Sequence, residues 1–331
     1  GNLGNAYRYL GELRKAIEFY EQALKIAKEI GDKRGEGRNL GNLGNAYRYL
    51  GELRKAIEYF DPAMKIAKEI GDKRGESADL GNLGSVYRSL GEPRKAIEYY
   101  RQALKIARDI GDKRGESADL GSLGLAYNDL GEPEKTIEYY EQTLKIAREI
   151  GDKRGESIDL GNLGLAYRNL GETKKAIEYY EQALKIAREI GDRRGKSINL
   201  GNLGNAYIDM GELRKAIEYY KQALKIAREI GDRQGESADL GGLGTAYCNL
   251  GEQKIAIEYY EQALKISREI GDRRREGNHL GNLGNAYSDL GEPRKAIEFF
   301  KESLAIGEAI EDPRIVSFCE QKLKELEEAD D

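Results

Sequence analysis

The sequence is poor in the residues that build disulfide frameworks, metal centres and membrane spans. Its 331 residues include two cysteines, one histidine, five prolines and no tryptophan. Two cysteines and one histidine exclude a disulfide framework, and they exclude a zinc site unless another molecule supplies ligands. No apolar run approaches the roughly 18 residues that a membrane-spanning helix needs. We therefore expect no metal and no membrane partner.

An excess of one charge is also missing. The 54 basic and 59 acidic side chains leave a formal net charge of −5. A dedicated nucleic-acid-binding protein would show a basic excess on one face. We therefore expect no nucleic-acid partner.

Glycine, by contrast, is abundant, and its positions reveal a repeat. Many of the 41 glycines fall in strings such as Gly-Asn-Leu-Gly-Asn-Ala-Tyr, which recur every 40 residues without insertion or deletion. A fixed period of this length is the signature of a repeat architecture, so residues 1–331 are expected to form a single array. Its eight copies start near Gly1, Gly41, Gly81, Gly121, Gly161, Gly201, Gly241 and Gly281.

Each copy predicts two amphipathic helices. In the second copy, apolar residues follow helical spacing over 40–50 and again over 53–70. Gly71 is suited to end the second helix, and Asp72 is suited to cap the next one. Neither helix can bury its apolar stripe alone, so the pairs must stack on their neighbours. Three prolines fall at the expected start of a second helix, where the missing N–H costs nothing: Pro93, Pro133 and Pro293.

This pattern resembles the tetratricopeptide repeat family, whose signature places Leu-Gly, Tyr, Gly, Ala, an aromatic residue and Ala at fixed offsets. In the second copy those positions are Leu43-Gly44, Tyr47, Gly51, Ala56, Phe60 and Ala63. The early Trp of the family is Leu40 here, and its closing Pro is absent. The 40-residue period is similar to longer-repeat arrays of the LGN/Pins and kinesin-light-chain type, and to prokaryotic arrays that accompany signalling or effector domains. The resemblance implies an all-α solenoid of helix-turn-helix repeats, wound into a right-handed superhelix whose concave side is lined by the first helices.

The two ends of the array differ from its middle. The first helix of the first copy is expected to be truncated at Gly1. Residues 313–331 are expected to form a C-terminal capping helix, with Asp312 as its N-cap and Pro313 at its first position. Gln321 and Lys324 replace two recurring glycines there. A charged outer face is what a solubilising terminal cap requires.

In the family that the sequence resembles, partner peptides bind along the first helices, and here those helices carry a recurring asparagine pair. A carboxamide both donates and accepts hydrogen bonds, so a ladder of asparagines could pair with the main chain of an extended peptide. Alternatively, the asparagines only solvate a wide groove. The ladder consists of Asn2, Asn5, Asn42, Asn45, Asn82, Asn162, Asn202, Asn205, Asn282 and Asn285.

The remaining groove positions change character along the chain. A basic end, an apolar middle and a weakly acidic end would orient a partner by charge, with its acidic part toward the N-terminal repeats. Ordinary variation of a solvated surface is the alternative. The N-terminal copies supply Arg8, Arg38, Arg48, Tyr49 and Arg88; the middle supplies Leu125, Ile158, Leu165 and Ile198, with Arg168 among them; the C-terminal copies supply Asp209 and Asp289.

Other chemistry is sparse. His279, the single histidine, has no nucleophile and carboxylate constellation around it, so we expect no enzyme activity and no cofactor. Cys248 and Cys319 lie two repeats apart, too far for a disulfide, which indicates reduced thiols in a cytoplasmic protein. The recurring glycines and tyrosines are interpreted as packing elements rather than a phosphate loop or a base-stacking platform. Pro62 predicts a kink inside a second helix.

Two hypotheses about function follow. In the first, the chain is a non-catalytic scaffold that binds a protein or peptide segment in its groove. In the second, it is a self-associating array, or the regulatory part of a longer signalling or effector protein. For either, we expect a chain that is mostly monomeric, with weak end-to-end association.

Overall fold

The computed structural model describes residues 2–328, apart from the side chain of Tyr9. Gly1 and the last three residues of the expected 313–331 helix therefore lie outside the described residues. Between residues 2 and 328 the chain forms α-helices, numbered α1 to α17, and no strand. It divides into two compact units, residues 1–155 and 156–331, which are described separately below.

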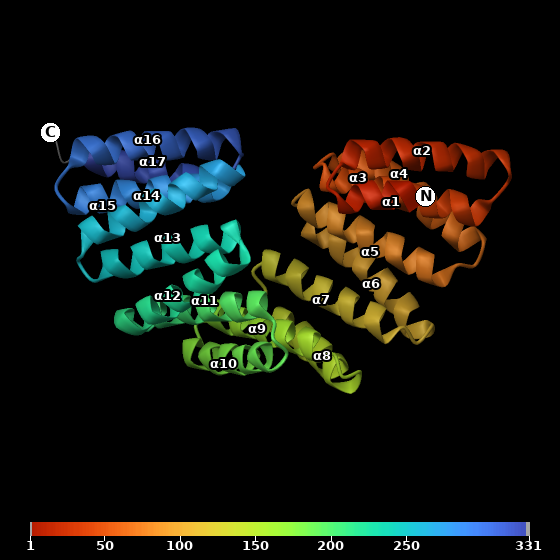
Figure 1. Ribbon diagram of the computed structural model, residues 1–331, viewed down its shortest axis with the longest axis horizontal. Coiled ribbons are helices and arrows are strands. Elements are labelled where there is room, and N and C mark those ends of the chain that lie inside the picture. The colour runs from red at the N-terminus through yellow and green to blue at the C-terminus, as the bar shows by residue number, and fades with distance from the viewer. Residues whose placement is uncertain (1, 329–331) are drawn as a thin grey trace. The chain divides into compact units, whose positions relative to one another are not determined.

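Every repeat contributes two antiparallel helices, so the predicted all-α helix-turn-helix organisation is confirmed (Figure 1). Unit 1 contains α1 (Asn2–Tyr9), α2 (Leu13–Glu29), α3 (Lys33–Tyr49), α4 (Leu53–Glu69), α5 (Lys73–Ser89), α6 (Pro93–Asp109), α7 (Lys113–Asp129) and α8 (Pro133–Glu149). Most of α9 (Lys153–Asn169) belongs to unit 2, followed by α10 (Thr173–Glu189), α11 (Arg193–Asp209), α12 (Leu213–Ile230), α13 (Arg233–Asn249), α14 (Gln253–Ile270), α15 (Arg273–Asp289), α16 (Pro293–Ala309) and α17 (Pro313–Glu328).

The turns between repeats use the predicted Gly-Asp pair. Gly71 ends α4 in the left-handed region, with a φ of 72° that favours glycine. The Asp72 carboxylate then accepts a hydrogen bond from the Gly75 N–H at 3.0 Å and so caps α5. Equivalent aspartates cap α3, α7, α11, α13 and α15. The predicted prolines begin α6, α8 and α16, as expected.

Glycine and aromatic side chains hold the two helices of a repeat together. A Cβ atom on Gly44 of α3 would lie 2.8 Å from the Phe60 ring of α4, so only glycine permits this approach. Phe60 is fully buried. Beside it, Tyr47 stacks on Tyr59 with ring centroids 5.1 Å apart. The predicted packing role of these residues is therefore confirmed.

The first helix of each complete repeat is longer than its apolar pattern predicts. α3 begins at Lys33, seven residues before the apolar stripe at Leu40. These early turns pack through small and polar residues instead: Asn39 is only 3% exposed, and its amide donates to the Gly35 carbonyl at 2.8 Å. Pro62 lies inside α4, which stays helical to Glu69. The kink expected there stays a prediction.

The two ends of the described chain differ, as the sequence predicts. α1 has 8 residues where α3 has 17. In α17, Ile315 and Cys319 are buried, while Gln321 and Lys324 are exposed. Asp312 accepts a hydrogen bond from the Arg314 N–H at 3.1 Å, in keeping with its predicted capping role. Both cysteines are free thiols.

Candidate functional site

Odd-numbered helices, which are the first helices of the repeats, contact one another within each unit. In unit 1, α5 contacts both α3 and α7; in unit 2, α13 contacts α11 and α15. Successive even-numbered helices make no comparable contact within the described residues. The odd helices therefore lie on the shorter, inner side of each unit. We call this surface the odd-helix groove.

The first asparagine of each pair is available to a ligand. Asn42, Asn82 and Asn202 are half-buried in the odd-helix groove, and Asn162 and Asn282 have similar exposure. None of these five side chains makes a hydrogen bond among the described residues. Asn2, at the start of α1, is exposed. These amides can therefore donate and accept toward the groove.

The second asparagine of the pair is used inside its own repeat. Asn205 accepts a hydrogen bond from the Tyr220 hydroxyl at 2.9 Å and donates to the Gly201 carbonyl at 3.2 Å. Asn5 likewise accepts from the Tyr20 hydroxyl at 2.7 Å. The peptide-ladder interpretation therefore rests mainly on the first asparagines.

Asn45 and Asn285 face buried phenylalanines instead of tyrosines, because Phe60 and Phe300 take the place of Tyr20 and Tyr220. Asn45 donates to the Gly41 carbonyl at 3.1 Å and accepts a long hydrogen bond, 3.4 Å, from the guanidinium of Arg48. Asn285 is half-buried. Sequence periodicity alone does not separate these roles from those of the first asparagines.

The groove arginines fall into two classes. Arg88 is paired with Asp129 of the next repeat at 2.6 Å, and Arg168 is paired with Asp209 through two of its nitrogens. Arg48 has no carboxylate partner; its guanidinium stacks on the exposed Tyr49 ring, 4.7 Å from the centroid. The charge of Arg48 is thus more available to an acidic ligand than that of Arg88.

Arg38 and Arg8, the other predicted N-terminal cations, lie on α3 and α1; Arg38 is exposed and Arg8 is half-buried. The apolar groove residues are exposed as well: Leu125 is 37% exposed, Leu165 is 39% exposed, and Ile158 and Ile198 are each 53% exposed. Exposed aliphatic side chains of this kind favour contact with apolar ligand groups.

Two cavities bring several of these residues together. In unit 1, a cavity of about 310 Å³ between α3, α4 and α5 is lined by Arg38, Asn42, Asn45 and Asn82. In unit 2, a cavity of about 320 Å³ is lined by Asn202 and Asn205 of α11 and by residues of α12, α13 and α15. In unit 1, predicted asparagines of neighbouring repeats therefore share one cavity, whereas both asparagines of the unit 2 cavity come from α11.

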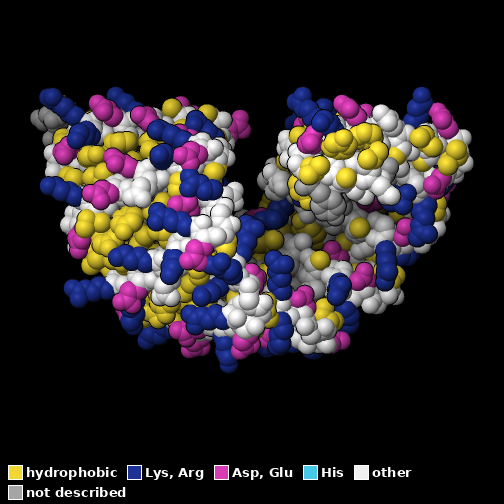
Figure 2. Space-filling view, in the orientation of Figure 1, with side chains coloured by type: hydrophobic (Ala, Val, Ile, Leu, Met, Phe, Trp, Pro, Cys, Tyr) yellow, Lys and Arg dark blue, Asp and Glu magenta, His cyan; other side chains and the backbone are white. Residues whose placement is uncertain are grey.

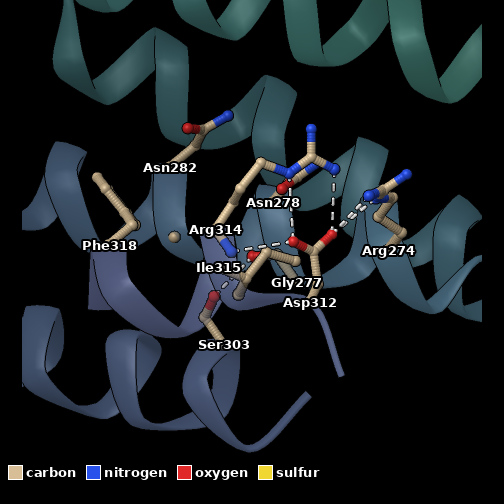
Figure 3. Close-up of a pocket in the computed structure, with 10 residues that line it drawn as sticks. Arg274, Gly277, Asn278, Asn282, Ser303, Asp312, Arg314, Ile315 and Phe318 are labelled. Carbon is tan, nitrogen blue, oxygen red and sulfur yellow. Dashed lines mark hydrogen bonds and ion pairs between the residues drawn. The ribbon is translucent and has the colours of Figure 1, made fainter. Parts of the chain in front are cut away.

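A third cavity, of about 490 Å³, lies between α15, α16 and α17 (Figure 3). Asn282 lines it, on the far side from Asp312 in this view. Arg274 and Arg314 both donate to the Asp312 carboxylate, at 2.8 and 3.3 Å, and these hydrogen bonds hold the pKa of Asp312 well below its usual range. The two arginines of this cavity therefore already share one internal carboxylate.

Buried carboxylates are a feature of the groove that the sequence analysis missed. Burial raises the pKa of Asp79 and Asp119 to about 7 and that of Asp239 to about 8. Asp119 and Asp239 are 8% and 6% exposed. The sequence signal was an Asp or Asn that recurs two residues before the glycine of each copy, in the polar early turns of the odd helices.

The structure assembles no recognisable catalytic or metal centre in the described residues. His279 is 5% exposed, and burial lowers its pKa to about 4. Its Nε2 atom lies 3.1 Å from the Ser237 hydroxyl, which also donates to the Ala263 carbonyl. No group of three or more His, Cys, Asp or Glu side chains among residues 2–328 is arranged to hold a metal ion. No helix in this range is long and apolar enough to cross a membrane.

Comparison with known families agrees with the repeat pattern. A family model described as Tetratricopeptide repeat matches residues 1–69, 36–109, 116–189, 160–229, 196–269 and 236–309. These matches together span most of the chain. No curated protein matches it.

Solved structures resemble the chain in fold. The apo form of the quorum sensor NprR from B. thuringiensis has a TM-score of 0.69 at 17% identity, over 92% of this chain and 86% of that chain. A Rap protein complexed with Competence and Sporulation Factor has a TM-score of 0.60 at 17% identity, over 97% and 96% of the two chains. A signal transduction ATPase with a tetratricopeptide repeat sensor, from Pyrococcus horikoshii, has a TM-score of 0.63 at 22% identity, over 95% of this chain and 50% of that one. At these identities the likeness shows the fold alone.

Proposed function

The chain belongs to the tetratricopeptide repeat family, and we propose that it is a non-catalytic scaffold whose odd-helix groove binds a segment of a partner protein. The observation that carries this proposal is the row of first asparagines. Asn42, Asn82 and Asn202 line cavities between successive odd helices, and their amides have no hydrogen-bond partner among the described residues. An asparagine inside a helix carries a propensity cost, which contact with a ligand would offset.

The available charges indicate what the segment contains. Within the part of the chain that the structure describes, Arg38 and Arg48 of unit 1 have no carboxylate partner, so this unit suits an acidic stretch of the ligand. Guanidinium groups form paired hydrogen bonds with carboxylates. Arg88 contributes less, because Asp129 already neutralises it. The bound factor in the Rap complex and the sensor role of NprR are properties of those proteins, and they agree with a binding function here.

The test is selection of ligands followed by removal of the amides. A library of random 15-residue peptides is panned against the chain, and the affinity of the selected peptides is measured by calorimetry. We expect the combined variant Asn42→Ala, Asn82→Ala and Asn202→Ala to weaken binding at least tenfold, because each lost amide removes hydrogen bonds worth about 1 kcal/mol. The thermal unfolding midpoint should stay nearly unchanged, since these side chains make no internal hydrogen bond.

A matched control removes three carboxamides from the even helices: Gln22→Ala, Gln182→Ala and Gln222→Ala. These side chains are exposed on α2, α10 and α12, away from the groove. The control should bind the selected peptides like the parent chain. Equal affinity of the groove variant and the parent would reject the asparagine ladder.

The second candidate, a self-associating or regulatory array, rests on a different observation. Leu3, Leu10, Ile26 and Ile30 of the first repeat are between 56% and 72% exposed. In space-filling view, apolar side chains gather over this part of unit 1 (Figure 2). Such a surface favours contact with another helix.

A further inference from the structure

A buried carboxylate without a partner stands in the wall of the unit 2 cavity. Asp239 lies in α13, is 6% exposed, and its Oδ2 atom accepts no hydrogen bond. It fits there because α11 offers a glycine: a Cβ atom on Gly201 would lie 3.1 Å from Oδ1 of Asp239. Burying an unpaired carboxylate is costly, so a missing partner at this position needs an explanation.

The two cations that line this cavity already pair with other aspartates. Arg194 and Arg275 both line the cavity. Arg194 lies 3.6 Å from the capping Asp232, and Arg275 lies 2.5 Å from the capping Asp272. Asp239 is therefore left without a counterion among the described residues.

The hydroxyl groups that line the cavity already donate hydrogen bonds to other acceptors. The Ser197 hydroxyl donates to the Ala223 carbonyl at 2.9 Å, and the Tyr220 hydroxyl donates to Asn205. Asn202 has its amide free, and its carbonyl oxygen is an acceptor. What Asp239 lacks among the described residues is a positively charged partner of its own.

The entrance of the cavity suits an alkyl chain. Ile198, one of its lining residues, is 53% exposed. The unit 1 cavity has Arg38 at the equivalent position, where a cation would repel a second one. The stem of a lysine side chain can pack on aliphatic surface while its ammonium group reaches a polar site.

We propose that the cavity between α11, α12, α13 and α15 binds a primary ammonium group, with Asp239 as its counterion and Ile198 against its alkyl stem. The cavity lies in the odd-helix groove, so the inference deepens the proposed function and rests on it for the natural source of the ammonium group, a lysine side chain of the bound segment. The binding chemistry itself can be tested without any peptide.

The neighbouring repeats show why this position differs. In α11, Asn199 occupies the place of Asp239 and satisfies itself by donating to the Gly195 carbonyl at 2.9 Å. In α15, His279 occupies it and contacts the Ser237 hydroxyl. An ionised aspartate at this position has acceptors only, so it can pair with an external cation, whereas Asn199 and His279 already have partners within the chain.

Ionisation of Asp239 gives the site a pH signature. Burial, with a smaller contribution from Asp232, raises the pKa of Asp239 to about 8. The other polar groups facing it are Ser197, Asn202 and Arg194 of α11, Tyr220 of α12 and Arg275 of α15. Below pH 8, Asp239 must release a proton to pair with the ammonium group, so affinity should rise about tenfold per pH unit between pH 6 and 8. It should fall again above about pH 10, where a lysine side chain loses its charge.

The experiment titrates the full chain with Nα-acetyl-lysine-N-methylamide and follows binding by calorimetry and by amide chemical shifts. The matched ligand Nα-acetyl-norleucine-N-methylamide has a similar stem without the charge. Alanine-N-methylamide carries only an α-ammonium group, and so distinguishes a side-chain source from a chain terminus. We expect the lysine derivative to bind and the norleucine derivative to bind at least tenfold more weakly. Equal binding of these two, or no binding of either ammonium ligand, would overturn the proposal.

Two variants and one control assign the site. Asp239→Asn should reduce affinity at least tenfold and abolish the rise between pH 6 and 8. Ile198→Arg, which copies the unit 1 cavity, should reduce it as well. Glu258→Gln removes an exposed carboxylate from α14 and should change nothing. Unchanged affinity of Asp239→Asn, together with an unchanged pH profile, would place the bound ammonium elsewhere.

The dependence of stability on pH shows whether the Asp239→Asn variant is folded. The folded pKa of Asp239, about 8, exceeds the value near 3.9 expected for the unfolded chain. Protonated Asp239 therefore stabilises the fold fully below about pH 4, and that stability is lost as the pH rises through 8. Asp239→Asn should stay folded and should show a flatter dependence of its thermal midpoint on pH. If lysine binding fails while selected peptides still depend on the first asparagines, the ammonium site is wrong and the groove function stands.

Discussion

The buried tyrosine hydroxyls of the even helices depend on single residues of the odd helices. Each partner lies 15 positions earlier in the chain, as Asn205 does for Tyr220. Where asparagine is replaced by a smaller residue, a hydroxyl takes over: Ser85 contacts Tyr100 at 3.2 Å, and Thr245 contacts Tyr260 at 3.1 Å. The side chain at this position therefore serves the fold before it serves a ligand.

Two of these tyrosines, Tyr140 and Tyr180, have a leucine at that position instead, Leu125 and Leu165. The Tyr180 hydroxyl is buried without a hydrogen-bond partner among the described residues. We expect Leu165→Asn to raise the stability of unit 2 by up to about 1 kcal/mol, since it supplies the missing acceptor. Thermal unfolding followed by circular dichroism would measure the change. In a Tyr180→Phe background the gain should vanish, because no hydroxyl is left to satisfy; a gain of equal size there would assign the effect to something other than the hydrogen bond.

Sequence reasoning located the asparagines but could not divide them by role. Both members of a pair sit on the same helix, three positions apart, and periodicity assigns both to the groove. The distinction depends on which amide faces the buried tyrosine of the following helix. The one signal of that contact in the sequence was that Ser85 and Thr245, which carry hydroxyl groups, occupy the position of Asn205 in two other repeats. The buried Asp79 and Asp239 were missed because a recurring carboxylate is usually a solvated one.

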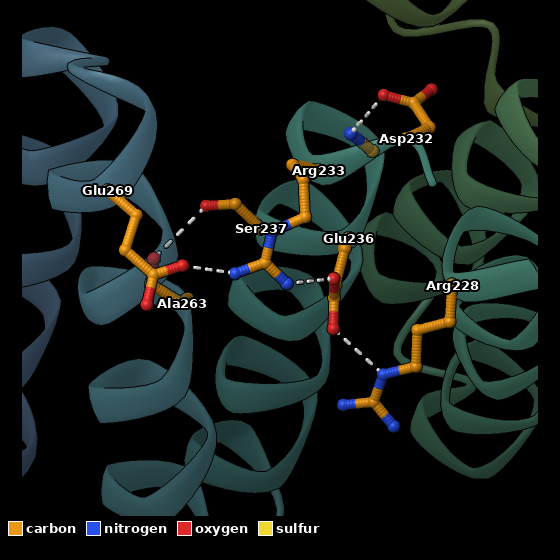
Figure 4. Close-up of polar contacts among 8 residues, drawn as sticks. Arg228, Asp232, Arg233, Glu236, Ser237, Ala263 and Glu269 are labelled. Carbon is orange, nitrogen blue, oxygen red and sulfur yellow. Dashed lines mark hydrogen bonds and ion pairs between the residues drawn. The ribbon is translucent and has the colours of Figure 1, made fainter. Parts of the chain in front are cut away.

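Successive helices of unit 2 are joined by polar contacts as well as by apolar packing. Arg228 of α12 donates to Glu236 of α13 at 2.8 Å, and the Ser237 hydroxyl reaches the Ala263 carbonyl of α14 at 3.2 Å (Figure 4). Arg233 of α13 bridges Glu236 of the same helix and Glu269 of α14. Together with Arg228, these contacts link α13 to both neighbouring even helices. Most of these charged side chains are exposed, and each pair contributes little on its own.

One arginine that pairs with a capping aspartate in other repeats is missing from α13, and a second arginine on α15 replaces it. Arg34 and Arg194 each approach the aspartate that caps the next odd helix, at 3.8 and 3.6 Å. The equivalent residue in α13 is Gln234, which carries no charge. Asp272, the aspartate that caps α15, pairs instead with Arg275, which occupies a position that holds glycine in the other repeats. Partial burial works to raise the pKa of Asp272, but hydrogen bonds from Arg275 outweigh it and lower that pKa.

The compensation can be reversed in two steps. We expect Arg275→Gln to raise the pKa of Asp272, because the charged donor is lost. Adding Gln234→Arg should lower that pKa again, since it restores the pairing used between the other repeats. Carboxyl NMR titration of Asp272 would measure both changes, and the accompanying loss of stability should be at most about 1 kcal/mol for so exposed a pair. A pKa that does not move in the first variant would show that Arg275 is not the compensating cation.

At the level of helices, sequence reasoning gave the second helices accurately and the first helices incompletely. The even helices bury a broad apolar stripe, as α4 does with Ala56, Phe60 and Ala63, and this produces a clear period. The early turns of the odd helices pack through Gly35 and Asn39, which carry no apolar signal. Tertiary contacts therefore extend these helices beyond what their pattern indicates.

At the scale of the whole molecule, the 40-residue period runs without interruption through Gly155, the boundary between the two units. The fold class was predictable because each repeat needs only its neighbours to bury its stripe. A right-handed superhelix through all eight repeats stays a prediction. The two ends of the described chain, however, present opposite surfaces. Leu3 and Leu10 of the first repeat are 60% and 72% exposed, whereas the exposed side chains of α17 include Gln321 and Lys324.

These opposite surfaces predict weak self-association that does not close into a ring. The apolar face over Leu10 and Ile30 can pack on an exposed repeat face of a second copy, and such a head-to-tail contact can extend. The charged outer face of α17, which includes the exposed Lys324, opposes docking at the other end. We therefore expect a monomer at micromolar concentration and growing assemblies at higher concentration, measured by light scattering.

Two substitutions in the apolar face, Leu10→Lys combined with Ile30→Lys, should suppress the growth of these assemblies. The control Leu250→Lys, which changes an exposed leucine of unit 2, should not. Removal of residues 313–331 should strengthen it, because Phe300 would lose the cover that α17 gives through Ile315 and Phe318. A stable dimer at micromolar concentration that persists in the Leu10→Lys, Ile30→Lys variant would show that a different surface associates.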